Sequence, residues 1–166
     1  RYEGDQRDER EDAGDEKHIE HERTLFRRDA RARWNAGVTV VTSKFEGASA
    51  GITVTAFTSL SLDPPLVLVC ISKRARMHAR LPVGGHIAVN MLSQDQELVS
   101  RAFASSKTDP FLQFGHRDGA TGAPILQDAM CAIECNIVQH IEGGDHTIVV
   151  GEVVATHMHE GKPLLY

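Results

Sequence analysis

A hydroxyl-rich segment that meets a proline break and then an apolar strand constrains the fold of this 166-residue chain more than any other feature. Residues 50–61 are mostly β-branched, small or hydroxyl-bearing, Asp63-Pro64-Pro65 interrupts them, and residues 66–71 are wholly apolar. Runs of this kind, bounded by Pro and Gly, predict short antiparallel strands. Because hydroxyl groups are costly to bury without hydrogen-bond partners, the segment also predicts a polar ligand that lies against the sheet.

Apolar alternation and β-branched residues indicate further strands. Together with the segments above, we predict strands over 38–42, 50–61, 66–71, 86–91, 131–141 and 146–156, with a turn at 45–48. Along 131–141, one face of the strand is expected to carry Ile133, Cys135, Ile137 and Ile141.

Fewer segments have the character of helices or loops. Thr24 is a plausible N-cap for a helix over 24–35, which Gly37 would end. Shorter helices are predicted over 75–81 and 94–104, and a glycine-rich loop over 111–124. Many strands, short turns and few helices favour a mainly β fold, a β-barrel with a few peripheral helices.

The first 23 residues are almost wholly charged or small and have no apolar stripe. Such a segment buries too little surface to offset its ordering entropy, so we predict a disordered or loosely helical tail over 1–23. A binding arm is the alternative. His18 and His21 would share a helix face, but structural zinc needs four ligands, so solvated histidines are favoured. One folded domain is predicted over 24–166.

Composition argues against several classes of function. The net charge is −5 and the basic residues are scattered, which is unlike a nucleic-acid-binding surface. No run of about 20 apolar residues occurs, so no membrane span or signal-peptide core is predicted. The three cysteines, Cys70, Cys131 and Cys135, lie in apolar contexts, which favours reduced, buried thiols and a cytoplasmic location. On a strand, Cys131 and Cys135 lie about 13 Å apart, too far to share a metal ion.

Short motifs give one alternative function. Neither G-x-G-x-x-G nor G-x-x-x-x-G-K-[ST] occurs, so a dinucleotide would have to bind without a Rossmann unit. The segment Gly47-Ala48-Ser49-Ala50-Gly51 matches G-x-S-x-G, and Asp145 and His146 follow downstream, so a serine hydrolase that uses Ser49 is an alternative. That motif requires a helix after the serine. The residues after Ser49 alternate as a strand does, which favours a hairpin turn.

The stretch 51–70, which contains Phe57-Thr58-Ser59-Leu60-Ser61 and Pro64-Pro65, and the later Gly144-Asp145-His146 resemble the flavin reductase family. Its members are the small reductase components of two-component flavin monooxygenases, and the likeness covers about 25–166. The resemblance implies a split β-barrel of the Greek-key, FMN-binding type. It also implies hydride transfer from NADH or NADPH to FMN or FAD, a homodimer, and a partner oxygenase that receives reduced flavin. A flavin-binding protein that does not oxidise nicotinamide is the alternative.

The resemblance further implies that the hydroxyl-rich strand lines the flavin ring and its ribityl chain. The candidate contacts are Thr53, Val54, Thr55, Thr58, Ser59, Leu60, Ser61, Cys70 and Phe103. Threonine is common on strands, so solvent-facing hydroxyls are the alternative explanation.

The segment that follows the apolar strand is the candidate site for the flavin phosphate. Its candidate residues are Ser72, Arg74, Ala75, Arg76 and His78. A helix start offers backbone N–H groups, and arginine offers bidentate donors, so both suit a phosphate. The family commonly has small hydroxyl residues where this chain has Lys and Arg. A solvated basic helix start is therefore the alternative.

Gly143-Gly144-Asp145-His146 predicts a hairpin turn between the last two strands. In the resembled family this hairpin carries Gly-Asp-His, which implies that His146 seats the nicotinamide. Its imidazole would donate a hydrogen bond to the carboxamide or pack against the ring. Asp145 is expected only to shape the turn, and closing the hairpin is the alternative role for His146. Hydride transfer needs neither a triad nor a metal, and we predict neither. His157 and His159 are expected at the surface.

Overall fold

The computed structural model describes residues 34–105 and 109–166. All the elements described below belong to the second of the two units into which the chain divides, Ala36–Tyr166. The predicted tail over 1–23, with His18 and His21, lies outside the described residues. Of the predicted helix over 24–35, only Trp34 and Asn35 are described, and neither is helical.

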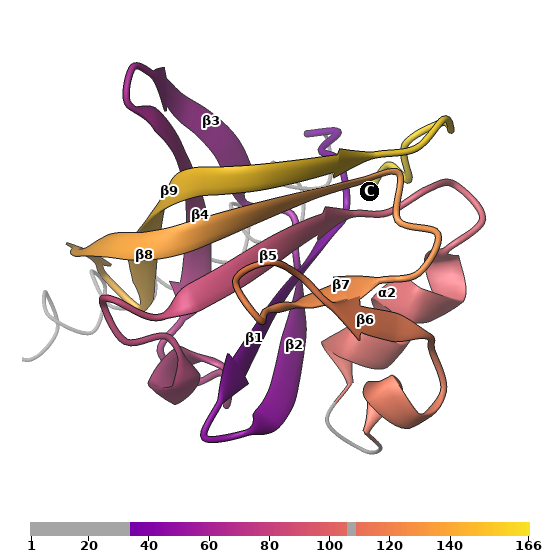
Figure 1. Ribbon diagram of the computed structural model, residues 1–166, viewed down its shortest axis with the longest axis horizontal. Helices are drawn as coiled ribbons and strands as arrows, with labels where there is room; N and C mark the ends of the chain where they lie inside the picture. The colour runs from indigo at the N-terminus through magenta and orange to yellow at the C-terminus, as the bar shows by residue number, and fades with distance from the viewer. Residues whose placement is uncertain (1–33, 106–108) are drawn as a thin grey trace, which may run out of the picture. The chain divides into compact units, whose positions relative to one another are not determined.

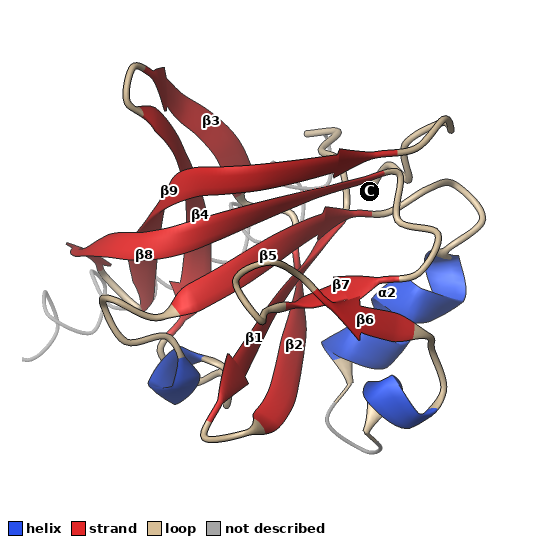
Figure 2. Ribbon diagram, in the orientation of Figure 1, coloured by secondary structure: helices blue, strands red, loops and turns tan. Residues whose placement is uncertain are grey.

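The second unit is built on a seven-stranded antiparallel sheet in the order β2-β1-β5-β8-β9-β4-β3. Figures 1 and 2 show the long β8–β9 hairpin across the sheet and the β3–β4 hairpin standing out at one edge. The strands of the sheet are β1 (Thr39–Phe45), β2 (Ala48–Val54), β3 (Phe57–Leu62), β4 (Pro65–Ser72), β5 (His86–Met91), β8 (Cys131–Gly143) and β9 (His146–Met158). The predicted mainly β fold is therefore confirmed.

Smaller elements lie outside this sheet. A two-stranded sheet pairs β6 (His116–Asp118) with β7 (Pro124–Leu126). One α-helix, α2 (Glu97–Ala104), and two short 3₁₀ helices, η3 (His78–Arg80) and η4 (Pro110–Leu112), complete the described elements. Helix α2 contacts β2 and η4.

The sheet curls around one main core. Val54 on edge strand β2 and Val67 on β4 belong to the same buried cluster as Ile87 on β5 and Val149 on β9. Residues from distant positions in the strand order meet only if the sheet coils on itself, which is how a barrel buries its interior. A second cluster seats α2, whose Phe103 packs with the buried apolar side chains beside β1.

Several predicted boundaries were wrong. The strand over 50–61 is two strands, because the chain bends at Thr55 and Ala56 between β2 and β3. The helix over 94–104 begins only at Glu97, because the Gln96 side chain accepts the Ser93 N–H and holds a turn there. The segment 75–81 is a set of turns that ends in η3. The predicted loop over 111–124 contains part of η4 and all of β6.

Strand β8 also differs from simple alternation. Its pairing with β9 shifts register between Glu134 and Cys135 and again between Ile137 and Gln139. The first shift skips Val154 on β9, so alternation along β8 continues, and Ile133, Cys135 and Ile137 pack into the main core on one face, as predicted. The second shift skips Val138 on β8, which moves the following side chains to the opposite face. Ile141, which follows this second shift, does not share the buried face and is 42% exposed.

The cysteines are less uniformly buried than predicted. Cys135 is fully buried, and burial together with the nearby charge of Glu134 raises its pKa to about 12. Cys70 and Cys131 are half-buried, and burial raises the pKa of each thiol.

Within residues 34–105 and 109–166, no three His, Cys, Asp or Glu side chains converge as metal ligands would. In the same part of the chain, no helix has the length and apolar character that a membrane crossing requires.

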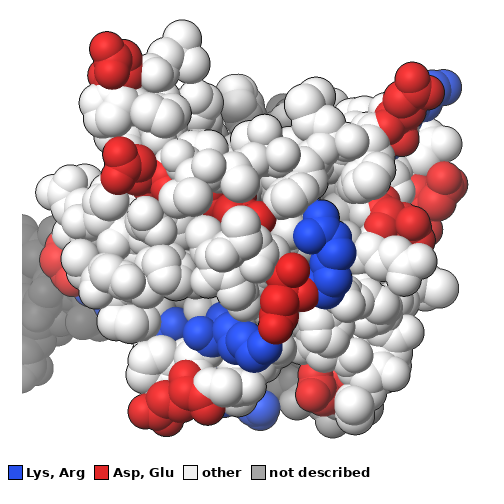
Figure 3. All heavy atoms as spheres, in the orientation of Figure 1, with Lys and Arg blue, Asp and Glu red and all other residues white. Residues whose placement is uncertain are grey.

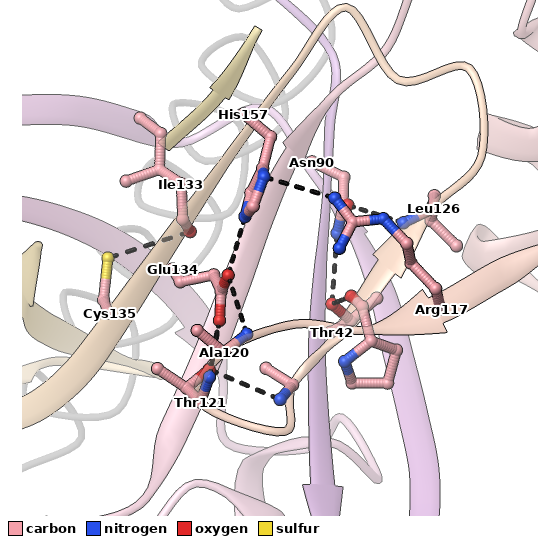
Figure 4. Close-up of polar contacts among 12 residues, drawn as sticks. Thr42, Asn90, Arg117, Ala120, Thr121, Leu126, Ile133, Glu134, Cys135 and His157 are labelled. Atoms are coloured by element: carbon pink, nitrogen blue, oxygen red, sulfur yellow. Dashed lines mark hydrogen bonds and ion pairs between the residues drawn. The ribbon is translucent and has the colours of Figure 1, made fainter. Parts of the chain in front are cut away.

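A buried carboxylate ties the β6–β7 turn to the sheet (Figure 4). Glu134 accepts the backbone N–H groups of Ala120 at 3.1 Å and Thr121 at 2.8 Å, and the Thr121 hydroxyl at 2.7 Å. His157 Nε2 donates to the same carboxylate at 2.7 Å. Arg117 Nη2 lies 3.2 Å from the other ring nitrogen, Nδ1, and donates to it. The half-buried His157 therefore has a structural partner and is not the simple surface residue expected.

Charged side chains elsewhere are mixed in sign. On the face drawn in Figure 3, acidic and basic residues lie interspersed, and neither sign forms one continuous field. Lys44 and Asp118, for example, form an exposed ion pair with 2.6 Å between Nζ and Oδ2.

Candidate functional site

The main cleft of the described chain has a volume of about 710 Å³. It lies among β2, the turns that follow β4, the end of α2, and η4. Its lining residues are Ala50, Gly51, Ile52, Arg74, Ala75, Arg76, Met77, Arg80, Phe103, Ala104, Ser105, Asp109, Pro110 and Phe111. Sites of this size accept ligands as large as nucleotides.

One wall of the cleft is a segment that we call the arginine loop, residues 73–80. After β4 ends at Ser72, the loop turns twice: Ala75 donates to the Ser72 carbonyl at 2.9 Å, and His78 donates to the Ala75 carbonyl at 3.0 Å. Met77 points into the main core and anchors the loop, since it is only 3% exposed.

The arginine loop brings three guanidinium groups to the cleft, those of Arg74, Arg76 and Arg80. No ion pair to any of the three is found in the described part of the chain. The predicted helix start is wrong, because only the three-residue η3 forms, and it begins after Arg76. A helix N-terminus is therefore not available to a phosphate at Arg74 and Arg76, whereas their guanidinium groups are.

The opposite wall is aromatic. The ring of Phe103 lies directly on the backbone of Gly51, where an added Cβ would approach Phe103 Cε1 to 2.6 Å. Phe111 packs edge-on against Phe103, with ring centroids 5.1 Å apart, and against His116 at 4.8 Å. Asp109 caps η4 by accepting the Phe111 N–H at 3.0 Å. Phe103 is buried, so the half-buried Phe111 is the ring with surface available to a ligand.

The arginine loop is joined to the β8–β9 hairpin that carries His146. Ser72 and His146 are directly paired across β4 and β9. Lys73 donates its backbone N–H to the Asp145 carbonyl at 3.0 Å and forms an ion pair with Glu142. This ion pair lowers the pKa of the Glu142 carboxyl. The structure thus brings the candidate phosphate segment and the candidate nicotinamide residue together where the neighbouring strands β4 and β9 meet at one end of the sheet.

His78 and Thr147 add a second tie between the same two segments, with 2.9 Å between Nε2 and Oγ1. Asp145 does more than shape the turn, because its Oδ1 lies 2.8 Å from His146 Nδ1. A carboxylate only accepts, so Nδ1 carries the proton and the lone pair of a neutral ring is on Nε2. In its neutral form, His146 is thereby arranged to accept a hydrogen bond through Nε2, whereas the sequence-based expectation was a donor.

Four of the predicted flavin contacts line the cleft: Arg74, Ala75, Arg76 and Phe103. The others do not. Thr53 uses its hydroxyl to hold α2, donating to the Ser100 carbonyl at 2.6 Å, and Val54 is part of the main core. Thr55 lies in the bend before β3 and Cys70 lies within β4.

The hydroxyl-rich residues of β3 form a separate surface. Thr58, Ser59 and Leu60 are exposed and Ser61 is half-buried, on a strand that pairs only with β4 in the described sheet. Their predicted contacts with flavin therefore involve a different surface from the cleft, and they stay predictions.

Sequence reasoning missed four polar or aromatic residues of the cleft: Arg80, Ser105, Asp109 and Phe111. The pair Asp109-Pro110 is a sequence signal for the start of a helical turn: Asp109 is the N-cap, and Pro110 occupies the first helical position. It could have placed Phe111 on a short helix. Arg80 had no signal of its own, since its approach to the cleft depends on the turns of the arginine loop.

The structure does not support the alternative of a serine hydrolase that uses Ser49. Ser49 lies within β2, opposite Lys44 on β1, and strand residues follow it. A nucleophile elbow requires a helix after the serine, so Ser49 is not held as such a nucleophile would be.

Comparison with known proteins identifies the family of this chain. The model of the flavin reductase like domain matches residues 31–166. An NADH-dependent flavin reductase from Rhodococcus sp is 40% identical over 86% of this chain and 81% of its own length. The structure of the NADH:FAD oxidoreductase from Streptomyces globisporus, in complex with NAD and FAD fragments, is 39% identical, with a TM-score of 0.82 over 87% of each chain.

Other relatives are longer than this chain. A probable flavin reductase from Rhizobium meliloti (strain 1021) is 43% identical over 77% of this chain, which spans only 42% of that relative. The reductase component of a 4-nitrophenol monooxygenase from Rhodococcus opacus is 35% identical, with 84% of this chain and 75% of the relative covered. The family match extends over most of the chain and includes the whole sheet, the arginine loop and the His146 hairpin. The chain therefore belongs to the flavin reductase family.

Proposed function

We propose that this protein is a flavin reductase that transfers hydride from NADH or NADPH to FMN or FAD. The observation that carries the proposal is the junction of the arginine loop with the His146 hairpin, through the Ser72–His146 pair and the Lys73–Asp145 backbone bond. At this junction the guanidinium groups of the arginine loop, which suit the phosphate of a flavin nucleotide, lie on a segment joined to His146, which suits the carboxamide of a nicotinamide. The relatives named for NADH-dependent flavin reduction support the same activity.

The residues of the cleft fit a flavin nucleotide. Arg74 and Arg76 present guanidinium groups that suit phosphate oxygens, and the half-buried Phe111 presents a ring face that suits a planar group. When bound, the flavin supplies the hydride acceptor and the nicotinamide nucleotide supplies the hydride. The task left to the chain is to hold the two close together and aligned.

His146 would orient the nicotinamide by accepting a hydrogen bond from the carboxamide NH₂ group at Nε2. The Asp145 carboxylate fixes the ring for that role by accepting from Nδ1 at 2.8 Å. No proton has to move at either nitrogen during hydride transfer. The contribution of His146 is therefore that of one neutral hydrogen bond, about 1 kcal/mol.

We further propose that the protein acts as a homodimer in which a second copy covers β3. This strand is an edge of the sheet, its Leu62 is 89% exposed and Leu60 is 49% exposed. Edge strands with exposed apolar side chains are normally covered. A second copy would also place the β3 hydroxyls, which do not line the cleft of their own chain, against a shared site.

Reduced flavin would then leave for a partner flavin-dependent oxygenase. Matches to reductase components of monooxygenases support this role.

The three cysteines form no disulfide, which fits a reducing compartment, and we propose a cytoplasmic location.

Steady-state oxidation of NADH and NADPH, each with FMN and with FAD, tests the proposal. His146→Ala should raise KM for the nicotinamide roughly five- to tenfold and leave flavin affinity nearly unchanged. Asp145→Asn should raise the same KM less, because the imidazole stays but loses its fixed orientation. Binding of flavin without nicotinamide oxidation by the unaltered protein would select the non-catalytic alternative. A loss of several thousandfold in His146→Ala would indicate acid–base chemistry instead.

A further inference from the structure

The second half of the arginine loop is joined to the sheet through the side chain of His78. This residue lies two positions after Arg76 and two before Arg80, and both arginines line the cleft. The neighbouring Met77 is buried in the main core, which fixes the backbone at this point. The imidazole is half-buried, and its Nε2 lies 2.9 Å from the Thr147 hydroxyl on β9. A change in the position of the later arginines is therefore passed directly to β9.

Thr147 in turn holds the part of β9 that carries His146. Its side chain is only 3% exposed and lies on the core face, directly opposite Ile71 of β4. Successive side chains of a strand point to opposite faces, so His146 lies on the other face. A buried hydroxyl needs a hydrogen-bond partner, and His78 supplies one. The position of the His78 imidazole therefore bears on the backbone that orients His146.

Other connections between the two segments lie at the start of the loop. Ser72 and Lys73 make them, through the strand pair with His146, a backbone bond to the Asp145 carbonyl and an ion pair with Glu142. This ion pair is exposed, and exposed ion pairs hold their partners weakly. The imidazole bond to β9 is thus the connection nearest to the two later arginines.

We propose that His78 couples the flavin and nicotinamide sites. Binding of a flavin phosphate by the arginine loop orders the loop, and the His78–Thr147 bond passes that order to the His146 hairpin, so that the nicotinamide binds more tightly. The inference rests on the proposed function for the identity of the two ligands. Its physical basis is that the first ligand carries part of the ordering entropy that the second would otherwise lose. His78 is then a positioning residue that acts through Thr147.

Equilibrium binding of NAD⁺, which has no hydride to donate, tests the coupling without turnover. The unaltered protein should bind NAD⁺ about fivefold more tightly with saturating FMN than without it. His78→Leu and Thr147→Val should each bring this factor close to one. The double variant should do no more than either single variant, because both remove the same hydrogen bond.

A conservative variant and a matched control separate this role from a general loss of structure. His78→Gln keeps an N–H donor near the position of Nε2 and should retain most of the coupling. His86 makes a similar bond between β5 and β8, with 2.9 Å between Nδ1 and Asn136 Oδ1, and His86→Leu should behave like the parent. A merely structural role would weaken binding of FMN alone and NAD⁺ alone, whereas the coupling role leaves both nearly unchanged.

Hydrogen exchange measures the ordering of the hairpin with FMN as the only ligand. FMN should slow exchange of the backbone amides over 144–148 in the unaltered protein and in His78→Gln. The same ligand should have little effect on these amides in His78→Leu. Slowing of equal size in His78→Leu would contradict transmission through the imidazole.

Three results of the binding experiment would overturn the inference. These are NAD⁺ affinity that is equal or weaker with FMN in the parent, a factor that His78→Leu retains, and a loss in His78→Gln as large as in His78→Leu. Thermal melting checks that each variant is folded. Oxidation of NADH with FMN is measured separately: turnover without coupling overturns this inference alone, and coupling without turnover overturns only the proposed function.

Discussion

Glu134 is a single buried carboxylate that holds a whole turn of the chain. Its side chain is fully buried. Burial by itself would raise the pKa of Glu134, but hydrogen bonds from Thr121, His157 and Ala120 outweigh that effect and lower it to about 2. Gly119 lies so close that an added Cβ would approach Glu134 Oε2 to 2.4 Å. The turn is therefore shaped around the charge.

This lowered pKa predicts an acid-sensitive stability. Because the folded-state pKa of Glu134 lies below its ordinary value of 4.5, the ionised carboxylate contributes stability above that pH. The contribution falls as pH drops from about 4.5 toward 2 and reaches about 3 kcal/mol in total. Urea unfolding across this range measures it. Glu134→Gln should be less stable at neutral pH and should lose most of this pH dependence; an unchanged slope would show that other groups cause it.

At single residues, the limits of sequence reasoning are clear. Arg74, Arg76 and His146 were predicted because they lie in short, recognisable motifs. Glu134 and Phe111 were not, because the significance of each depends on partners distant in sequence, such as Thr121 and Phe103. A buried charge is invisible in a sequence until its hydrogen-bond donors are known.

Among the elements, the long strands were predictable and the small ones were not. Apolar and β-branched runs located β4, β5 and β9 within a few residues of their observed ends. Strand β7 was missed since three buried residues are too few to show a period. The two register shifts in β8 were missed because bulges depend on the partner strand.

The contact between α2 and β2 gives a prediction at this level. An alanine at Gly51 would bring its Cβ within 2.7 Å of two atoms of the Phe103 ring, so α2 would have to move away from the cleft. Overpacking of this kind costs about 1–3 kcal/mol. Gly51→Ala should therefore lower the unfolding free energy by that amount in denaturant titrations. Gly37→Ala is the control, because nothing lies within 4 Å of its added Cβ. Equal stability of the two variants would contradict the packing described.

At the level of the whole molecule, the proposed dimer explains why hydroxyls predicted for flavin lie outside the cleft. If a second copy covers β3, a charge at Leu62 should be buried without a partner and disfavour association. Leu62→Glu should therefore be monomeric in light scattering after size exclusion. Leu98→Glu, exposed on α2 at 72%, should behave like the parent. A parent protein that is already monomeric at micromolar concentration would contradict the dimer.

Direct hydride transfer is the central claim, and anaerobic mixing of the protein with equimolar flavin and NADH tests it most directly. The flavin absorbance and the NADH absorbance should fall together, one NADH consumed for each flavin reduced. Arg74→Ala with Arg76→Ala should slow the reaction at limiting FMN and leave riboflavin, which lacks phosphate, unaffected. A flavin that stays bound and oxidised while NADH persists would contradict the account.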